Sequence, residues 1–180
     1  MKELSLHLLD VAQNSVSAGA GCIDLTLEED GTRSWRLTIA DDGCGMSPEF
    51  LAQVTDPFTT TRTTRKVGLG LPLLRMAAEQ TGGGLSIESR VGEGTTVTAL
   101  FYGGHIDCPP LGDLSGTVAL LIQGAPDVEW TWQHTTPKGS CTLDTRQLRE
   151  ILGPDVPLSE PSVVLWIGEY LQEQEESIQM

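Results

Sequence analysis

Four polar residues near the N-terminus recur at the spacing of one helix face: His7, Asp10, Asn14 and Ser17. Residues three and four apart lie on one side of an α-helix, so they form a polar stripe facing away from the apolar side. An amide oxygen one turn from a carboxylate, as in Asn14 and Asp10, can bind Mg²⁺ beside an ordered water. The stripe therefore predicts a magnesium site, and a solvated helix face is the simpler alternative.

A carboxylate followed by two glycines closes a strand-like run, in the segment 41–46 (DDGCGM). A tight turn would explain the glycines by itself. The functional interpretation is that Asp41 accepts the exocyclic amine of adenine, while Gly43 and Gly45 let the backbone approach the ring closely. This segment therefore predicts an adenine site that the nearby polar stripe could complete.

A basic stretch comes before a helix that begins with two glycines. Arg62, Arg65 and Lys66 are three of only 11 basic residues in the chain. Such a segment suits a lid over a triphosphate, and the helix opened by Gly68 and Gly70 can receive phosphate oxygens on its N–H groups. A flexible basic linker is the alternative, but it does not explain why a helix would begin with two costly glycines.

A fourth glycine motif, 92–97 (GEGTTV), is also compatible with a hairpin turn. The order of the four motifs carries more information than any one of them. Together they resemble the N, G1, G2 and G3 boxes of the GHKL superfamily, which includes DNA gyrase, the heat-shock chaperone ATPase, sensor histidine kinases and mismatch-repair ATPases. The resemblance covers roughly residues 3–102 and implies a Bergerat-type fold that binds ATP and Mg²⁺ between a mixed sheet and its helices.

The resemblance also assigns roles to single residues. Asn14 is the implied Mg²⁺ ligand, Asp41 the adenine anchor, and Thr95 a water-mediated adenine contact. The remaining residues implied around the nucleotide are Gly43, Gly45, Met46, Arg62, Arg65, Lys66, Gly68, Leu69, Gly70 and Leu71. These assignments predict that Asp41→Asn abolishes nucleotide binding, whereas Asp10→Asn spares it.

One departure from the family bears on catalysis. Hydrolysing members carry Glu four residues before the box Asn, where this chain has Asp10. The shorter side chain withdraws the carboxylate from the attacking water, which predicts weak intrinsic ATP hydrolysis. The segment 56–60 (DPFTT) resembles the F box of histidine kinases, so it also favours the kinase members of the family over the hydrolysing ones. Three classes stay open: a stand-alone kinase that phosphorylates His or Ser of a separate protein, an ATP-gated protein-binding module, and a weak ATPase.

The composition narrows the partners. The chain has 180 residues and a net charge of −14. This charge argues against nucleic acid as a partner, because nucleic-acid phosphates bind to clustered Lys and Arg side chains. No run approaches transmembrane length, so we expect a cytoplasmic protein without a membrane partner. A regulatory protein partner or substrate is expected, and a homodimer stays open. The four cysteines lack zinc or disulfide-framework spacing, which favours reduced, packed thiols.

The elements that must position these motifs follow from periodicity and breakers. We expect an α/β (α+β) two-layer sandwich, with helices on one face of a mixed sheet. The residues before 105 carry a net charge of −5 and those after 104 carry −9. We therefore divide the chain into an ATP-binding domain, 1–104, and an acidic C-terminal α+β extension, 105–180. Helices are expected over 3–18, 69–81, 145–152 and 161–175, with strands over 22–29, 35–40, 85–90 and 95–102.

The C-terminal extension matches no motif that predicts a chemistry. His105 and His134 are interpreted as ordinary surface residues, and His7 as a poor phosphoacceptor. Packing of the last helix on its own domain is favoured modestly over partner docking. Trp130, Trp132 and Trp166 are compatible with either role.

Overall fold

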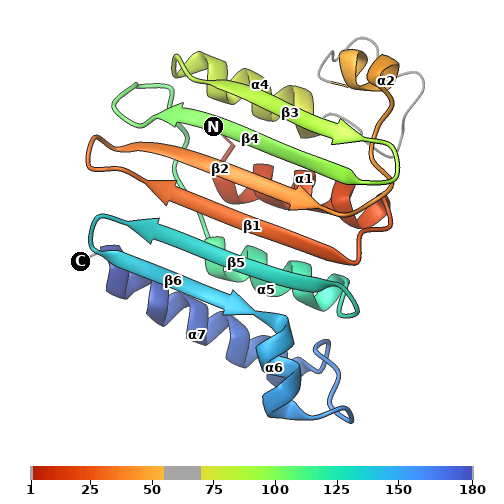
Figure 1. The fold of residues 1–180 in the computed structure, drawn as a ribbon. Coiled ribbons are helices and arrows are strands. Elements are labelled where there is room, and N and C mark those ends of the chain that lie inside the picture. The colour runs from red at the N-terminus through yellow and green to blue at the C-terminus, as the bar shows by residue number, and fades with distance from the viewer. Residues whose placement is uncertain (1, 55–69, 180) are drawn as a thin grey trace.

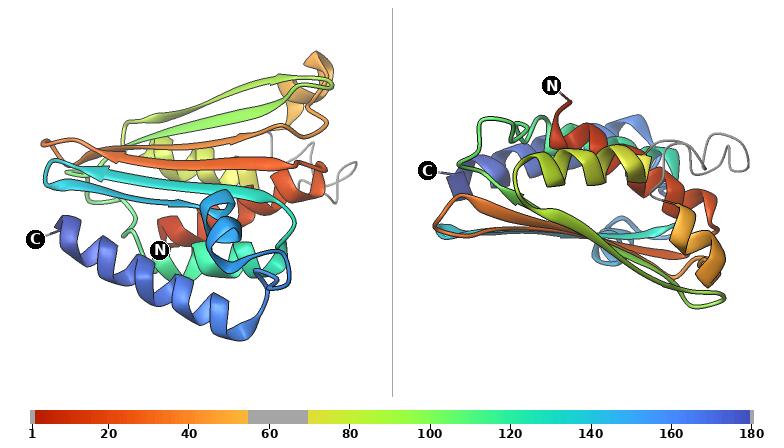
Figure 2. Two further views of the ribbon diagram at one scale, coloured as in Figure 1. Left: turned by 60° about the horizontal axis from the view of Figure 1, so that its bottom comes forward. Right: turned by 90° about the horizontal axis from the view of Figure 1, so that it is seen from above.

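The computed structural model describes residues 2–54 and 70–179. Its strands form one six-stranded sheet in the order β3-β4-β2-β1-β5-β6, and the four longest of the described helices lie on one face of it (Figures 1 and 2). The strands are β1 (Cys22–Glu29), β2 (Ser34–Asp41), β3 (Gly84–Arg90), β4 (Gly94–Tyr102), β5 (Glu129–Thr136) and β6 (Gly139–Asp144). The helices are α1 (Leu4–Ser17), α2 (Pro48–Gln53), α4 (Gly70–Gln80), α5 (Leu114–Gly124), α6 (Thr145–Leu152) and α7 (Pro161–Gln179). The predicted two-layer sandwich is confirmed.

The sheet is mixed because β1 pairs in parallel with β5, while its other neighbour, β2, is antiparallel. Burial alternates along the central strands, as expected for a sheet covered on one side. In β1, for example, the side chains that face the helices are Ile23, Leu25 and Leu27. The opposite, open face carries short polar side chains, among them Thr26 and Thr38, which face each other across β1 and β2.

The C-terminal segment continues the N-terminal sheet. Strand β5 extends it at β1, and β6 pairs with β5 to form the outer edge. Helix α5 packs between α1 and α7 (Figure 2). The buried side chains of both parts of the chain form one continuous core. The division at residue 104 stays a prediction.

The start of α2 is determined by the residues next to it. Ser47 caps α2 by accepting a hydrogen bond from the Phe50 N–H at 3.2 Å, and Pro48 occupies the first turn. No helix within residues 2–54 and 70–179 has the length and apolar content needed to span a bilayer. All four cysteines are free.

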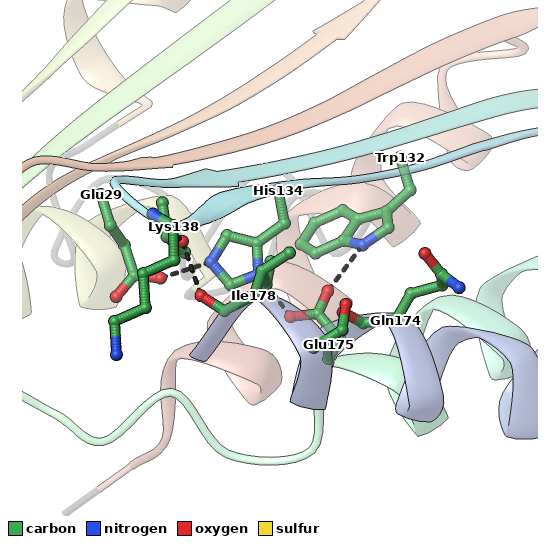
Figure 3. Close-up of polar contacts among 9 residues, drawn as sticks. Glu29, Trp132, His134, Lys138, Gln174, Glu175 and Ile178 are labelled. Atoms are coloured by element: carbon green, nitrogen blue, oxygen red, sulfur yellow. Dashed lines mark hydrogen bonds and ion pairs between the residues drawn. The ribbon is translucent and has the colours of Figure 1, made fainter. Parts of the chain in front are cut away.

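The interpretation of His134 as a surface residue is wrong. Its side chain is 0% exposed and bridges Glu29 of β1 and Glu175 of α7 through its two ring nitrogens (Figure 3). Trp132 Nε1 donates to the other oxygen of Glu175 at 3.0 Å. Burial lowers the pKa of His134, but the hydrogen bonds and charges of Glu175 and Glu29 outweigh it and raise the pKa to about 9. We call these four residues the histidine clamp, because they tie α7 to the sheet.

Candidate functional site

A cavity of about 250 Å³ opens beside α1, where β2 and β4 meet the first turn of α4. Six of the residues expected around a nucleotide line it. They are Asn14, Asp41, Gly45, Met46, Leu71 and Thr95. The wall is completed by Val11, Ser15, Ser17, Ala18, Cys44, Phe50 and Val97. Motifs that lie more than 80 residues apart in the sequence therefore meet around one mainly apolar hollow, as ligand sites require.

Asp41 sits at the last position of β2, with its carboxylate held from two sides. The Gly43 N–H donates to Oδ1 at 2.9 Å, and the Ser15 hydroxyl donates to Oδ2 at 2.6 Å. An ionised carboxylate has about four lone-pair directions, so these two bonds leave each oxygen able to accept another donor. Asp41 is thus oriented to receive an amine inside the cavity.

The loop after Asp41 needs its glycines for close approach. A Cβ on Gly45 would lie 1.9 Å from the Arg90 carbonyl oxygen, and its φ of +71° is left-handed. Gly43 is buried without room for a side chain, because a Cβ there would lie 2.9 Å from Ala18 Cβ. Between the two glycines, the Cys44 N–H donates to Ala18 O at 2.9 Å. The glycines therefore let this loop pack directly onto the end of α1.

Thr95 lies directly opposite Asp41 in the pairing of β2 with β4. Its hydroxyl is 2.7 Å from the Ser89 hydroxyl, which donates to Gly94 O at 3.0 Å and accepts from the Met46 N–H at 2.8 Å. Because the Ser89 proton goes to Gly94, the Thr95 hydroxyl donates to Ser89. Its lone pairs then remain free to accept a hydrogen bond from a water or ligand.

The far end of the cavity joins α1 to the start of α4. A Cβ on Gly70 would lie 3.4 Å from Asp10 Cβ and 3.5 Å from Asn14 Nδ2, which are ordinary contact distances, so α4 begins directly against these two residues of α1. The Asn14 Nδ2 atom is buried without a hydrogen-bond partner, and Asp10 forms an ion pair with Lys2. A buried amide without a partner, beside a helix start, marks where a polar ligand would compensate it.

These residues fit a bound magnesium nucleotide. The carboxylate of Asp41 matches the adenine amine, and the Asn14 amide can turn its oxygen toward a metal. Helix α4 begins at Gly70, beside Asn14, and the N–H groups at a helix start can receive phosphate oxygens. The predicted lid and phosphate residues lie outside the described residues. They are Arg62, Arg65, Lys66, Gly68 and Leu69, together with the motif at 56–60.

The polar stripe on α1 is only partly a solvated or cavity-lining face. His7 is 3% exposed and its Nδ1 has no hydrogen-bond partner, so its expected position on the polar, outward side is wrong. Burial, followed by the positive charge of Lys2, lowers the pKa of His7 to about 4. A neutral, buried imidazole cannot present itself to a separate protein.

Sequence reasoning missed two hydroxyls that organise the site. Ser15 directly follows the predicted metal ligand and Ser89 lies near the end of β3, yet neither belongs to a glycine motif. Ser15 could have been noticed, because it lies on the apolar face of α1, where a serine is out of place. Ser89 gave no local signal, because only the pairing of β3 with β4 places it beside Thr95.

Comparison with known proteins agrees with this geometry. The chain belongs to the family of histidine kinase-, DNA gyrase B- and HSP90-like ATPases, whose model matches residues 2–102. Over 101 residues it is 35% identical to the sensor protein SrrB of Staphylococcus aureus strain NCTC 8325 / PS 47, and equally so to that of strain COL. The match covers 53% of this chain but 17% of SrrB, so the chain spans about a sixth of that relative.

A solved structure extends the likeness in fold. The N-terminal domain of a DNA repair protein superposes with a TM-score of 0.54 at 16% sequence identity, over 86% of this chain and 58% of that one. Residues 2–102 make up 56% of the 180-residue chain, so the shared fold continues into the C-terminal segment. This similarity concerns the fold alone.

Proposed function

We propose that this chain binds Mg-ATP in the cavity beside α1 and transfers the γ-phosphoryl group to His or Ser of a separate protein. The observation that carries the nucleotide part is the pre-oriented carboxylate of Asp41, which faces the same cavity as the unpartnered amide of Asn14. Membership of an ATPase family whose relatives include a sensor protein supports the kinase part.

Each end of the cavity has a proposed task. Asp41 and Thr95 hold the base, Asn14 holds the metal, and the first turn of α4 receives the phosphates. Bound Mg²⁺ supplies charge neutralisation at the β- and γ-phosphates. In the transfer, the acceptor nitrogen or oxygen bonds to the γ-phosphorus while the bond to the bridging oxygen breaks. ADP keeps that electron pair, and the acceptor proton leaves to solvent.

The state of Asp10 favours transfer over hydrolysis. Hydrolysis needs a carboxylate free to accept a proton from water, and the Asp10 carboxylate is engaged by the Lys2 ammonium. The same observation favours the second candidate function, an ATP-gated protein-binding module without useful chemistry.

An acceptor outside the chain is supported by the positions of its three histidines. His7 and His134 are buried. His105 follows β4 at the end opposite Thr95, and the eight residues from Thr95 to Tyr102 span about 23 Å of strand. None of the three is both exposed and near the cavity. A cytoplasmic location remains our expectation for an ATP-consuming protein.

The test is an incubation of the purified chain with γ-labelled ATP, Mg²⁺ and cell lysate, following released phosphate and labelled protein. Label on one lysate protein, absent when Asp41→Asn replaces the parent chain, would support the kinase and identify its substrate. Tight ATP binding with neither transfer nor release would instead favour the ATP-gated module. Rapid phosphate release without labelling would contradict both.

A further inference from the structure

Helix α7 carries a second set of side chains that the fold does not use. Its inward face is buried on α5 and the β5–β6 strands through Val163, Ile167, Leu171 and Ile178. Its outward face combines apolar and acidic side chains. These are Leu165, Trp166, Glu169, Glu173 and Glu176, which we call the α7 outer face.

The apolar part is large and ordered. Leu165 is 63% exposed and Trp166 is 49% exposed, although isolated exposed leucines are ordinary on protein surfaces. Trp166 stacks on Tyr170 one turn later, with ring centroids 5.2 Å apart and an interplanar angle of 11°. An indole held flat on the surface by its neighbour can meet a partner at little further entropic cost.

The acidic part accepts a hydrogen bond from Gln172 Nε2 to Glu176 at 3.4 Å, but it takes part in none of the ion pairs among the described residues. Glu169, Glu173 and Glu176 follow the apolar pair at helical spacing, and α7 contains no lysine or arginine. From Leu165 to Glu176 the face is about 16 Å long, roughly three helical turns.

We propose that the α7 outer face docks a basic amphipathic helix of a partner protein. The partner would place an apolar side chain against Trp166 and Leu165, and Lys or Arg side chains, spaced four and three residues apart, against the three glutamates. The face lies outside residues 2–102, so it belongs to this chain's tail and not to the part that matches the family model.

Charge favours a basic helix as the partner over a second copy of the chain or an anionic membrane. A second copy would bring together two tails that each carry 12 acidic and 3 basic residues, which repel. An anionic membrane surface attracts basic segments and would repel the glutamates. A basic helix is the one of the three that gains from both halves of the face, since apolar burial gives affinity and charge gives orientation and speed of association.

Trp166 also provides the readout. Trp35, Trp130 and Trp132 are buried, so Trp166 is the half-exposed member of the four tryptophans in the chain. Titration of the full chain with a synthetic Leu/Lys amphipathic peptide of about 18 residues, five helical turns, should shift its emission to the blue and protect it from acrylamide. The matching Leu/Glu peptide should do neither.

Variants can distinguish docking on the α7 outer face from general electrostatic attraction to the acidic chain. The triple variant E169Q/E173Q/E176Q should weaken binding of a labelled Leu/Lys peptide about tenfold at low salt, an effect that high salt removes. The control D127N/E150Q/D155N removes three exposed charges from the same tail and should bind like the parent. Trp166→Ala should weaken binding about tenfold, whereas Tyr102→Ala, an equally exposed aromatic on β4, should not.

Three results would overturn the proposal. The first is equal weakening by the two triple variants, because the peptide would then be sensing net charge alone. The second is a sedimentation profile in which the parent chain dimerises and Trp166→Ala does not, which would assign the face to a second copy. The third is a blue shift of Trp166 on vesicles of anionic lipid, which would assign it to a membrane.

Discussion

The cavity region and the histidine clamp both bury polar side chains, but they differ in whether the buried polar atoms have hydrogen-bond partners. In the clamp, both nitrogens of His134 and both oxygens of Glu175 have partners. On α1, Asn14 Nδ2, at the cavity, and His7 Nδ1, further toward the N-terminus of the helix, are buried without any. A satisfied buried network stabilises and orders a fold, whereas an unsatisfied one has a cost that a ligand can remove. The contrast therefore assigns the clamp to stability and the cavity to binding.

The largest expected effect comes from breaking the clamp. His134→Gln removes the positive charge between Glu29 and Glu175 and should lower the free energy of unfolding by about 3–5 kcal/mol, because two carboxylates then face each other without compensation. Urea unfolding measures the loss. His105→Gln, which changes an exposed histidine, is the control and should leave stability unchanged. Equal stability of both variants would show that the clamp is not structural.

The clamp should also make stability fall at alkaline pH. Folding raises the pKa of His134 from 6.5 to about 9, so the folded state holds a proton that the unfolded state has released. The stabilisation is complete below pH 6.5 and is lost as pH rises through 9, on the order of 3 kcal/mol in all. Unfolding free energies measured between pH 6 and 10 should show this slope, and the slope should disappear in His134→Gln.

His7 should act in the opposite direction. Its pKa falls from 6.5 to about 4 on folding, so the unfolded state binds the proton more readily. This contribution is complete above pH 6.5 and is lost as pH falls through 4. A His7→Asn variant should therefore lose part of the acid slope and keep the alkaline one. A single histidine controlling both slopes would contradict the comparison.

At the cavity the expected effects appear in binding. Asp41→Asn replaces an acceptor oxygen with a donor where the Ser15 hydroxyl and the Gly43 N–H both donate and where we propose that the adenine amine donates as well. Loss of a charge-assisted hydrogen bond costs about 1.5–3 kcal/mol, so ATP affinity by calorimetry should fall at least tenfold. Asp42→Asn, one residue further on and exposed, and Asp10→Asn should both bind ATP normally. Unchanged affinity in Asp41→Asn would refute the pocket assignment.

The smallest effect is expected at the hydroxyl that orients Asp41. Ser15→Ala removes the 2.6 Å hydrogen bond to Oδ2 and should weaken ATP binding by about fivefold, equivalent to about 1 kcal/mol. Ser5→Ala is the matched control, because Ser5 is equally buried on the same helix but does not line the cavity. If both variants bind alike, Ser15 has no part in positioning the carboxylate.

Local patterns predicted most of the elements and part of the site. The apolar spacing predicted a helix over 3–18 against the observed Leu4–Ser17, and the strand expected over 95–102 is β4. Glycines marked the loops at 43–45 and 92–94, where a Cβ on Gly45 or Gly94 would lie 1.9 or 2.0 Å from a neighbouring backbone oxygen. The role of Ser89 could not be predicted from the sequence, because the hydrogen bonds of a hydroxyl depend on which groups the fold places next to it.

The amino-acid sequence by itself determined the periodic elements, the glycine loops, and the order of motifs that identifies the family. Each of these depends on residues within a few positions of one another, where sterics and side-chain period act directly. Tertiary structure alone decided that β5 lies parallel to β1 and that the tail extends the same sheet. It also decided the charge of His134, whose partners lie 105 and 41 residues away along the chain. Contacts at that separation follow from how whole elements pack, and no local pattern records them.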